Sequence, residues 1–252
     1  MAVNKARIAH RFAAAAGSYE QHADAQKQIH QHLLSLLLER GTAFGKILEI
    51  GCGTGLLTRL LAEHVRAEHW VANDLSAGCL ETLRQRMPSE IRCRYLCGDA
   101  ETLDFGSGYD VVVSASAVQW FEDKERFVRR CARMLDSDGL LLFNTFSENN
   151  LCEIKSLTGV GLDYPDAAQW RRWLGADFNV QELSEYTVCL NFADPLDVLK
   201  HLKLTGVTAA GSMVWTRQRL AAFRENYRAR FAAADGGVSL TYRPLYISAV
   251  RK

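Results

Sequence analysis

The chain has 252 residues, of which 48% are hydrophobic and 23% charged, and its formal net charge is +1. This length suits one α/β domain with appendages and is too short for two full domains. Because no apolar run reaches transmembrane length, no signal-peptide core follows the first residues and the charge is near zero, we expect a cytoplasmic protein with neither membrane nor nucleic-acid partners.

Residues 1–41 are expected to form a helical arm. The apolar spacing of residues 4–16 is helical, Gly17 interrupts it, and a second helical pattern runs on to Leu38. Tyr19 follows the interruption, where an arm folded over a ligand would bring an aromatic hydroxyl near it. Ordinary helix packing explains Tyr19 equally well.

The expected core, residues 44–192, opens with an apolar strand that ends on Glu49 and turns through Gly51-x-Gly53-x-Gly55 into a helical pattern. Glycine permits positive φ and close backbone approach to a ligand, and the next helix offers free N–H groups. The spacing fits neither the G-x-G-x-x-G dinucleotide fingerprint nor a P-loop. It resembles motif I of the class I methyltransferases that use S-adenosylmethionine (SAM), in which Glu49 would hold the methionine end. A glycine turn without a ligand is the alternative.

Two further strands are expected to end on carboxylates. The second ends at Asp74, followed by Leu75, where a βαβ unit places the carboxylate that accepts ribose hydroxyls. A helix cap is the alternative role of Asp74. The third leads to Asp99-Ala100, which resembles motif III of the same methyltransferases, where the carboxylate and the next N–H contact adenine. Since the carboxyl ends of parallel strands meet, we expect Glu49, Asp74 and Asp99 to line one groove.

The fourth expected strand, residues 109–114, is followed by Gln119-Trp120. Many small-molecule methyltransferases place the methyl acceptor at this strand end, and the pair offers an amide beside a flat apolar wall. Trp120 would also suit a core position, since aromatic side chains bury large areas anywhere.

Three more strands complete the expected sheet, namely residues 140–146, residues 180–192 and a last, antiparallel strand within residues 238–252. A helical insert, residues 193–237, precedes the last strand. We therefore expect a Rossmann-like α/β fold with a mostly parallel seven-stranded sheet. Residues 200–252 carry ten Lys or Arg against two acidic residues, which indicates either solvated helix faces or a surface for an acidic partner or anionic substrate.

Seven cysteines are scattered without a C-x-x-C pair and without clustering near histidine. This distribution predicts free thiols in a reducing compartment and no zinc site.

Several stretches together resemble the malonyl-acyl carrier protein O-methyltransferase family of early biotin synthesis, over nearly the whole chain. Besides the core motifs, they are Tyr19-Glu20-Gln21-His22-Ala23, Ala117-Val118-Gln119-Trp120, Leu202-Lys203-Leu204-Thr205-Gly206-Val207-Thr208 and Leu240-Thr241-Tyr242-Arg243. Asn73 and Leu204-Thr205 depart from the family pattern, which leaves the substrate fit open.

The resemblance implies that a malonyl carboxylate attacks the SAM methyl, giving a methyl ester and S-adenosylhomocysteine (SAH). A carboxylic acid with pKa near 4 is already ionised at neutral pH, so the chemistry requires neither a general base nor a metal. The site does require a cation or donor that selects a carboxylate; Lys203 and Arg243 are candidates, assisted by Tyr19 and Gln119. The basic insert would steer the acidic malonyl-acyl carrier protein, with malonyl-coenzyme A as another acceptor.

Two other interpretations stay open. The same scaffold would suit methylation of another small acid or a quinone-type metabolite, and a SAM-binding protein without turnover would need only the cofactor motifs.

Overall fold

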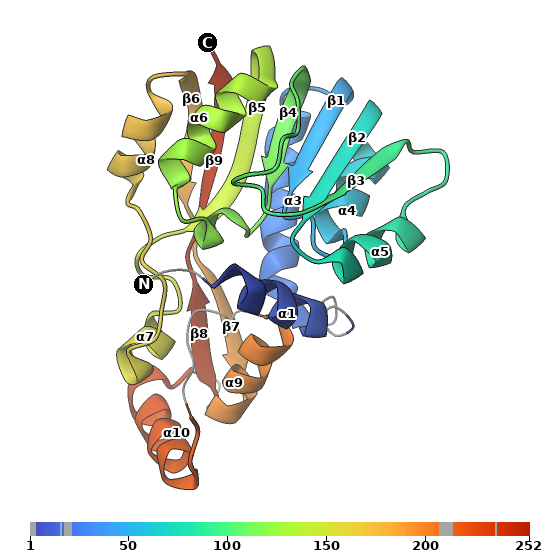
Figure 1. The fold of residues 1–252 in the computed structure, drawn as a ribbon. Helices are drawn as coiled ribbons and strands as arrows, with labels where there is room; N and C mark the ends of the chain where they lie inside the picture. The colour runs from blue at the N-terminus through green and yellow to red at the C-terminus, as the bar shows by residue number, and fades with distance from the viewer. Residues whose placement is uncertain (1–3, 16, 18–21, 207–213, 235) are drawn as a thin grey trace.

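The computed structural model describes residues 4–15, 17, 22–206, 214–234 and 236–252 (Figure 1). The strands are β1 (Ala43–Ile50), β2 (Arg66–Asp74), β3 (Cys93–Cys97), β4 (Tyr109–Ser114), β5 (Leu135–Phe146), β6 (Phe178–Glu185), β7 (Val188–Phe192), β8 (Val238–Tyr242) and β9 (Pro244–Arg251). The helices are α1 (Lys5–Ala15), α3 (Asp24–Leu38), α4 (Leu56–His64), α5 (Ala77–Arg86), α6 (Lys124–Met134), α7 (Cys152–Thr158), α8 (Ala167–Leu174), α9 (Pro195–Leu204) and α10 (Arg217–Phe231), with a 3₁₀ turn η1 (Val118–Trp120).

Seven strands form one sheet in the order β3-β2-β1-β4-β5-β9-β6, and β7 pairs with β8 in a second sheet. Strands β1 to β5 pair in parallel, whereas β9 lies antiparallel between β5 and β6. This arrangement confirms the predicted Rossmann-like sheet with an antiparallel last strand. Because the strand order reverses between β1 and β4, the carboxyl ends of these strands border a ligand crevice.

Hydrophobic side chains alternate between the two faces of the large sheet. Ile47 packs with Trp70 and helices α3 and α4 on one face, whereas Leu48 packs with Val71 and helix α6 on the other. Both faces are buried, which explains why the central strands are apolar runs rather than alternating patterns.

Two expected strands are each broken in two, so the prediction of continuous strands over residues 180–192 and 238–250 was wrong. The β6–β9 pair ends where the Tyr186 N–H donates to the Pro244 carbonyl at 2.9 Å, and the chain then continues as the β7–β8 pair. Each half keeps one buried face, so the alternation of apolar residues runs through the break without marking it. Pro244, which has no N–H to donate, is the one local signal of the interruption.

Helix α1 lies across the carboxyl edge of the large sheet, between that sheet and the smaller β7–β8 sheet (Figure 1). Helices α1 and α3 fall within the predicted arm, and α9 and α10 within the predicted insert. The carboxylate of Asp194 links the last two helices, because it caps α9 at the Leu196 N–H and accepts hydrogen bonds from Arg224 and Arg228 on α10.

All seven cysteines lie within the described ranges, and none of them forms a disulfide. Across the same parts of the chain, the helices are too short or too polar to cross a membrane.

Candidate functional site

The three glycines of the loop after β1 all adopt positive φ, at 72° for Gly51, 55° for Gly53 and 85° for Gly55. A Cβ on Gly51 would lie 2.4 Å from the Cβ of Ala117, and one on Gly55 would lie 2.2 Å from Leu83. Packing therefore excludes side chains at these two positions. A Cβ on Gly53 would meet nothing within 4 Å, so Gly53 borders open space of the kind that a ligand can fill.

Glu49, at the end of β1, is almost fully buried, and one of its carboxylate oxygens, Oε2, has no hydrogen-bond partner. Burial, with a smaller contribution from the nearby Asp74 charge, raises the pKa of Glu49 to about 8. A buried carboxyl group without a cation is costly to ionise. The side chain is thus suited to a ligand that brings its own positive charge.

Asp74 is the last residue of β2, and backbone N–H groups donate to both of its carboxylate oxygens. Its Oδ2 accepts from the Gly53 N–H at 2.9 Å, and its Oδ1 accepts from the Ser76 N–H at 2.8 Å. Ser76, not Asp74, caps helix α5, since the Ser76 hydroxyl accepts from the Cys79 N–H. The alternative role of Asp74 as the helix cap is therefore excluded.

Asp99 is joined to helix α1 by an ion pair. The Lys5 ammonium lies 2.6 Å from Asp99 Oδ2 and 2.5 Å from Glu101 Oε2. Burial opposes ionisation of Asp99, but the Lys5 ammonium and the Glu101 N–H outweigh it, so the pKa of Asp99 is lowered. The predicted adenine-contacting carboxylate is thus tied to α1.

A cavity of about 110 Å³, here called the cofactor cavity, brings together most of the predicted cofactor residues. Gly55 is not among the described residues that line this cavity; its positive φ and its close packing on Leu83 shape the turn instead. Helix α1 covers this cavity with Lys5, Ile8, Ala9 and Phe12, and its volume is below the roughly 300–1,000 Å³ of small-molecule sites. The predicted residues that line it are Glu49, Gly51, Gly53, Asp74, Leu75, Asp99 and Ala100.

His30 of α3 also lines the cofactor cavity, and the sequence analysis did not identify it. The ring is buried, its Nδ1 has no partner, and burial lowers its pKa to about 4. A histidine on the apolar face of a helix carries no sequence signal that separates a core position from a ligand-binding one.

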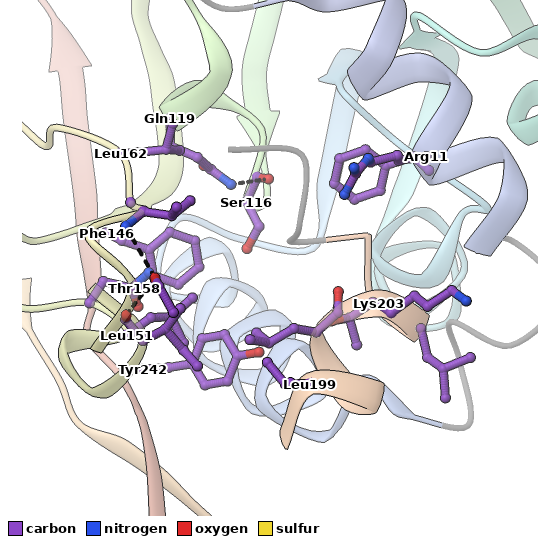
Figure 2. Close-up of a pocket in the computed structure, with 18 of the residues that line it drawn as sticks. Arg11, Ser116, Gln119, Phe146, Leu151, Thr158, Leu162, Leu199, Lys203 and Tyr242 are labelled. Carbon is purple, nitrogen blue, oxygen red and sulfur yellow. Dashed lines mark hydrogen bonds between the residues drawn. The ribbon is translucent and has the colours of Figure 1, made fainter. Parts of the chain in front are cut away.

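A second cavity of about 1190 Å³, here called the acceptor cavity, adjoins the first (Figure 2). Three residues, Phe12, Ser116 and Trp120, line both cavities and define the junction between them. Much of the remaining wall is apolar and comes from Leu151, from α7 and the segment after it, and from α9 with Leu199 (Figure 2).

The charge of the acceptor cavity has one sign. Arg7 and Arg11 of α1 and Lys200 and Lys203 of α9 line it, and none of its described lining residues is acidic. In Figure 2, Arg11 and Lys203 lie on the side opposite Leu162. This wall favours an anionic ligand.

Gln119 and Trp120 lie in η1, directly after β4, as predicted. The Gln119 amide Nε2 donates to the Ser116 carbonyl at 2.6 Å, and its Oε1 has no partner. Trp120 is 7% exposed, its indole Nε1 has no partner, and its ring packs edge-to-face on Phe12 at a centroid distance of 6.1 Å. Ser116 itself has a φ of 51°, and its N–H is fixed by Asn144 at 2.8 Å. Such backbone strain is often found at functional sites.

The structure treats the other predicted acceptor residues differently. Lys203 lines the acceptor cavity, whereas Arg243 lines neither cavity and instead contacts Glu185 at 3.4 Å and the Thr187 hydroxyl at 2.8 Å. Tyr19 lies outside the described residues.

Gln26 of α3 was not predicted. It lines the acceptor cavity, is 3% exposed and has an unpartnered Oε1. Its place on a helix that is otherwise buried by apolar residues gives no sequence signal. Among the residues that the structure describes, no group of three or more His, Cys, Asp or Glu side chains is placed to hold a metal ion.

The sheet order, the glycine loop and the acidic strand ends define a class I SAM-dependent methyltransferase, and a family model described as a methyltransferase domain matches residues 48–143. Two solved structures share the fold. YcgJ from Bacillus subtilis is 17% identical with a TM-score of 0.63, covering 88% of this chain and 99% of its own. The N-methyltransferase NodS from Bradyrhizobium japonicum, in complex with SAH, is 16% identical with a TM-score of 0.54, covering 93% and 98%.

Two relatives of known name narrow the class of SAM-dependent methyltransferases to one family. The malonyl-[acyl-carrier protein] O-methyltransferase of Porphyromonas gingivalis is 45% identical over 98% of this chain and 96% of its own length. The enzyme of the same name from Haemophilus influenzae is 40% identical over 98% and 95%. The chain belongs to the malonyl-[acyl-carrier protein] O-methyltransferase family and is an enzyme.

Proposed function

We propose that this enzyme methylates the free carboxylate of a malonyl group carried as a thioester on acyl carrier protein, with SAM as methyl donor and SAH as the second product. The methyl ester would enter the pimeloyl branch of biotin synthesis. The observation that carries the proposal is the junction at Trp120, where a cavity lined by the cofactor motifs meets a cation-bearing cavity without a described acidic residue.

The cofactor cavity has the donor and acceptor groups that SAM requires. Glu49 would face the methionine ammonium, and Asp74 with Leu75 beside it would hold the ribose. Asp99 and the Ala100 N–H would bind adenine, which requires Asp99 to exchange its Lys5 contact for the adenine amino group. When bound, the cofactor supplies an electrophilic methyl group; the protein supplies position and charge.

The acceptor needs no general base, because a carboxylic acid is ionised at neutral pH. The protein has to orient it toward the junction and strip part of its hydration shell, and the apolar walls around Leu151 and Leu199 serve that purpose. The cations on α1 and α9, Lys203 among them, favour entry of an anion. Contacts that are too strong would make the attacking oxygen less nucleophilic.

The size of the acceptor cavity fits a thioester arm better than a free small acid. Its 1190 Å³ exceed what a malonyl group fills, and leave room for a pantetheine chain. The excess of Lys and Arg in residues 200–252 would attract an acidic carrier protein. Within this segment Arg224 and Arg228 already contact Asp194, so part of that charge is neutralised internally.

Transfer of a radiolabelled methyl group from SAM to malonyl-carrier protein, malonyl-coenzyme A and free malonate, compared side by side, tests the proposal. We expect malonyl-carrier protein to be the best acceptor. Asp74→Ala should abolish transfer and SAH binding, while the exposed Asp163→Ala should change neither. SAH binding by the wild-type enzyme without methylation of any malonyl thioester would refute the proposal and favour another acid, a quinone-type acceptor or a non-catalytic SAM-binding protein.

A further inference from the structure

Among the described residues at the junction of the two cavities, only one has a buried hydrogen-bond donor without a partner. The acceptor carboxylate has to reach this junction to meet the methyl group, and the described residues that line both cavities are Phe12, Ser116 and Trp120. Phe12 has no polar side-chain atom. The Ser116 hydroxyl lies 3.5 Å and 3.4 Å from the amide atoms of Asn144 and is already engaged. This leaves Trp120.

The indole nitrogen of Trp120 is a donor only and cannot accept a hydrogen bond. Nε1 is buried and has no hydrogen-bond partner among the residues that the structure describes. A buried donor left unpaired costs roughly 1–3 kcal/mol. At the junction of two cavities a ligand can satisfy such a donor, whereas the equally unpaired Nε1 of Trp170 lies in a residue that lines neither cavity. A carboxylate, which accepts only, is the complementary group.

Neighbouring Gln119 cannot take this role. Its Nε2 is committed to the Ser116 carbonyl, which fixes the amide so that the unpartnered atom is the acceptor Oε1. An amide oxygen repels a carboxylate and suits an N–H donor instead. The cations Arg7, Arg11, Lys200 and Lys203 line the acceptor cavity but not the cofactor cavity, so none of them lines both cavities as Trp120 does.

On the basis of the proposed function, we propose that the indole N–H of Trp120 donates a hydrogen bond to the acceptor carboxylate, and that this neutral donor, rather than a lysine or arginine, positions the nucleophile. A neutral donor fixes the orientation of one oxygen while withdrawing less electron density than a cation would. The other oxygen stays reactive toward the methyl group. No bond of the protein changes in this step.

The test is binding to the SAH-loaded enzyme, measured by calorimetry with malonyl-pantetheine and with its methyl ester. Trp120→Phe keeps an aromatic ring against Phe12 but removes the N–H. A semisynthetic or genetically encoded benzothiophene analogue at position 120 retains the indole shape and also lacks the donor. We expect both changes to weaken malonyl-pantetheine about ten- to hundredfold, and the ester, which offers only a neutral acceptor, by about fivefold or less. The KM for malonyl-pantetheine should rise in parallel.

Trp170→Phe is the matched control, because its Nε1 is likewise buried and unpartnered but Trp170 lines neither cavity. It should leave both affinities unchanged, and SAH affinity should stay within about twofold in every variant. Equal losses of affinity for the acid and the ester would overturn the inference, because they would mean that Trp120 acts only as an apolar wall. Full affinity of the benzothiophene variant for malonyl-pantetheine would also overturn it. A wild-type enzyme that binds malonyl-pantetheine without methylating it would refute the proposed function but still allow this comparison. Binding of neither acceptor would overturn both.

Discussion

Cofactor binding should release a proton from Glu49. In the unliganded protein the pKa of this buried carboxyl is raised to about 8, so about 90% of the molecules carry a neutral Glu49 at pH 7. A cofactor ammonium beside it would favour the carboxylate and return the pKa toward its ordinary value of 4.5. Binding at pH 7 should therefore release about 0.9 proton.

The same shift sets the pH dependence of affinity. Deprotonation costs about 1.4 kcal/mol for each pH unit below the pKa, so SAH should bind about ninefold more tightly at pH 7 than at pH 6. The gain should level off above pH 8, where Glu49 becomes mostly ionised and the amino group of the ligand begins to lose its charge.

Calorimetric titration with SAH in buffers of different ionisation enthalpy measures the proton count directly. Glu49→Gln should bind SAH more weakly, with no proton release and a flat profile between pH 6 and 7. Folding of the wild-type enzyme has to protonate Glu49, so the wild type loses stability as pH rises from about 4.5 to 8. Without ligand at pH 7, Glu49→Gln should therefore be more stable than the wild type. A wild-type enzyme that exchanges no proton and binds equally at pH 6 and 7 would refute this reasoning.

Gly53→Ala should lower the free energy of unfolding by only about 1 kcal/mol, because of the left-handed backbone, yet weaken SAH binding more than tenfold. Gly55→Ala should destabilise the protein by more than about 2 kcal/mol, because its Cβ meets Leu83. Chemical denaturation and calorimetry measure the two effects, and normal SAH binding by Gly53→Ala would contradict the first. Asp194→Ala should lower the free energy of unfolding by about 1–2 kcal/mol, measured by chemical denaturation, and raise the acceptor KM without changing SAH affinity. Because the pKa of Asp194 is lowered in the folded protein, the stability that Asp194 contributes should disappear as pH falls through that pKa. In steady-state kinetics Lys203→Met should raise the acceptor KM in a salt-dependent manner, because Lys203 lines the acceptor cavity. Arg243→Met should leave the acceptor KM within about twofold of the wild-type value, because Arg243 contacts Glu185 instead. The reverse pattern would assign the acceptor site to Arg243.

The cofactor side of the site was predictable because its residues follow from strand ends. Glu49, Asp74 and Asp99 each lie within two residues of the carboxyl end of a strand, and a parallel sheet brings such ends together whatever the remaining packing. The position of Gln119 and Trp120 could be predicted for the same reason, because both follow the carboxyl end of β4.

The acceptor side was less predictable, because it depends on how separate elements meet. The pattern of residues 4–16 indicates a helix, but not that Lys5 and Phe12 would border one cavity while Arg7 and Arg11 border another. Gln26 is a buried polar residue on an apolar helix face, which in the sequence is indistinguishable from a tolerated core position. The choice of Arg243 rested on a family stretch whose neighbour, Tyr242, is the residue that lines the cavity.

The break between the β6–β9 pair and the β7–β8 pair would allow recombination to exchange the segment between Tyr186 and Pro244 as one piece. The chain leaves the large sheet at Tyr186 and returns at Pro244, and these two residues are hydrogen-bonded neighbours. A crossover at this pair would exchange β7, α9, α10 and β8 as a cassette without altering β1, which carries Glu49, or the segment after β3, which carries Asp99. Trp120 and the α1 and α7 residues of the acceptor cavity lie outside the cassette. A laboratory chimera joined at the same pair would therefore take from the donor of the cassette only the wall that α9, α10 and β8 form, Lys203 included.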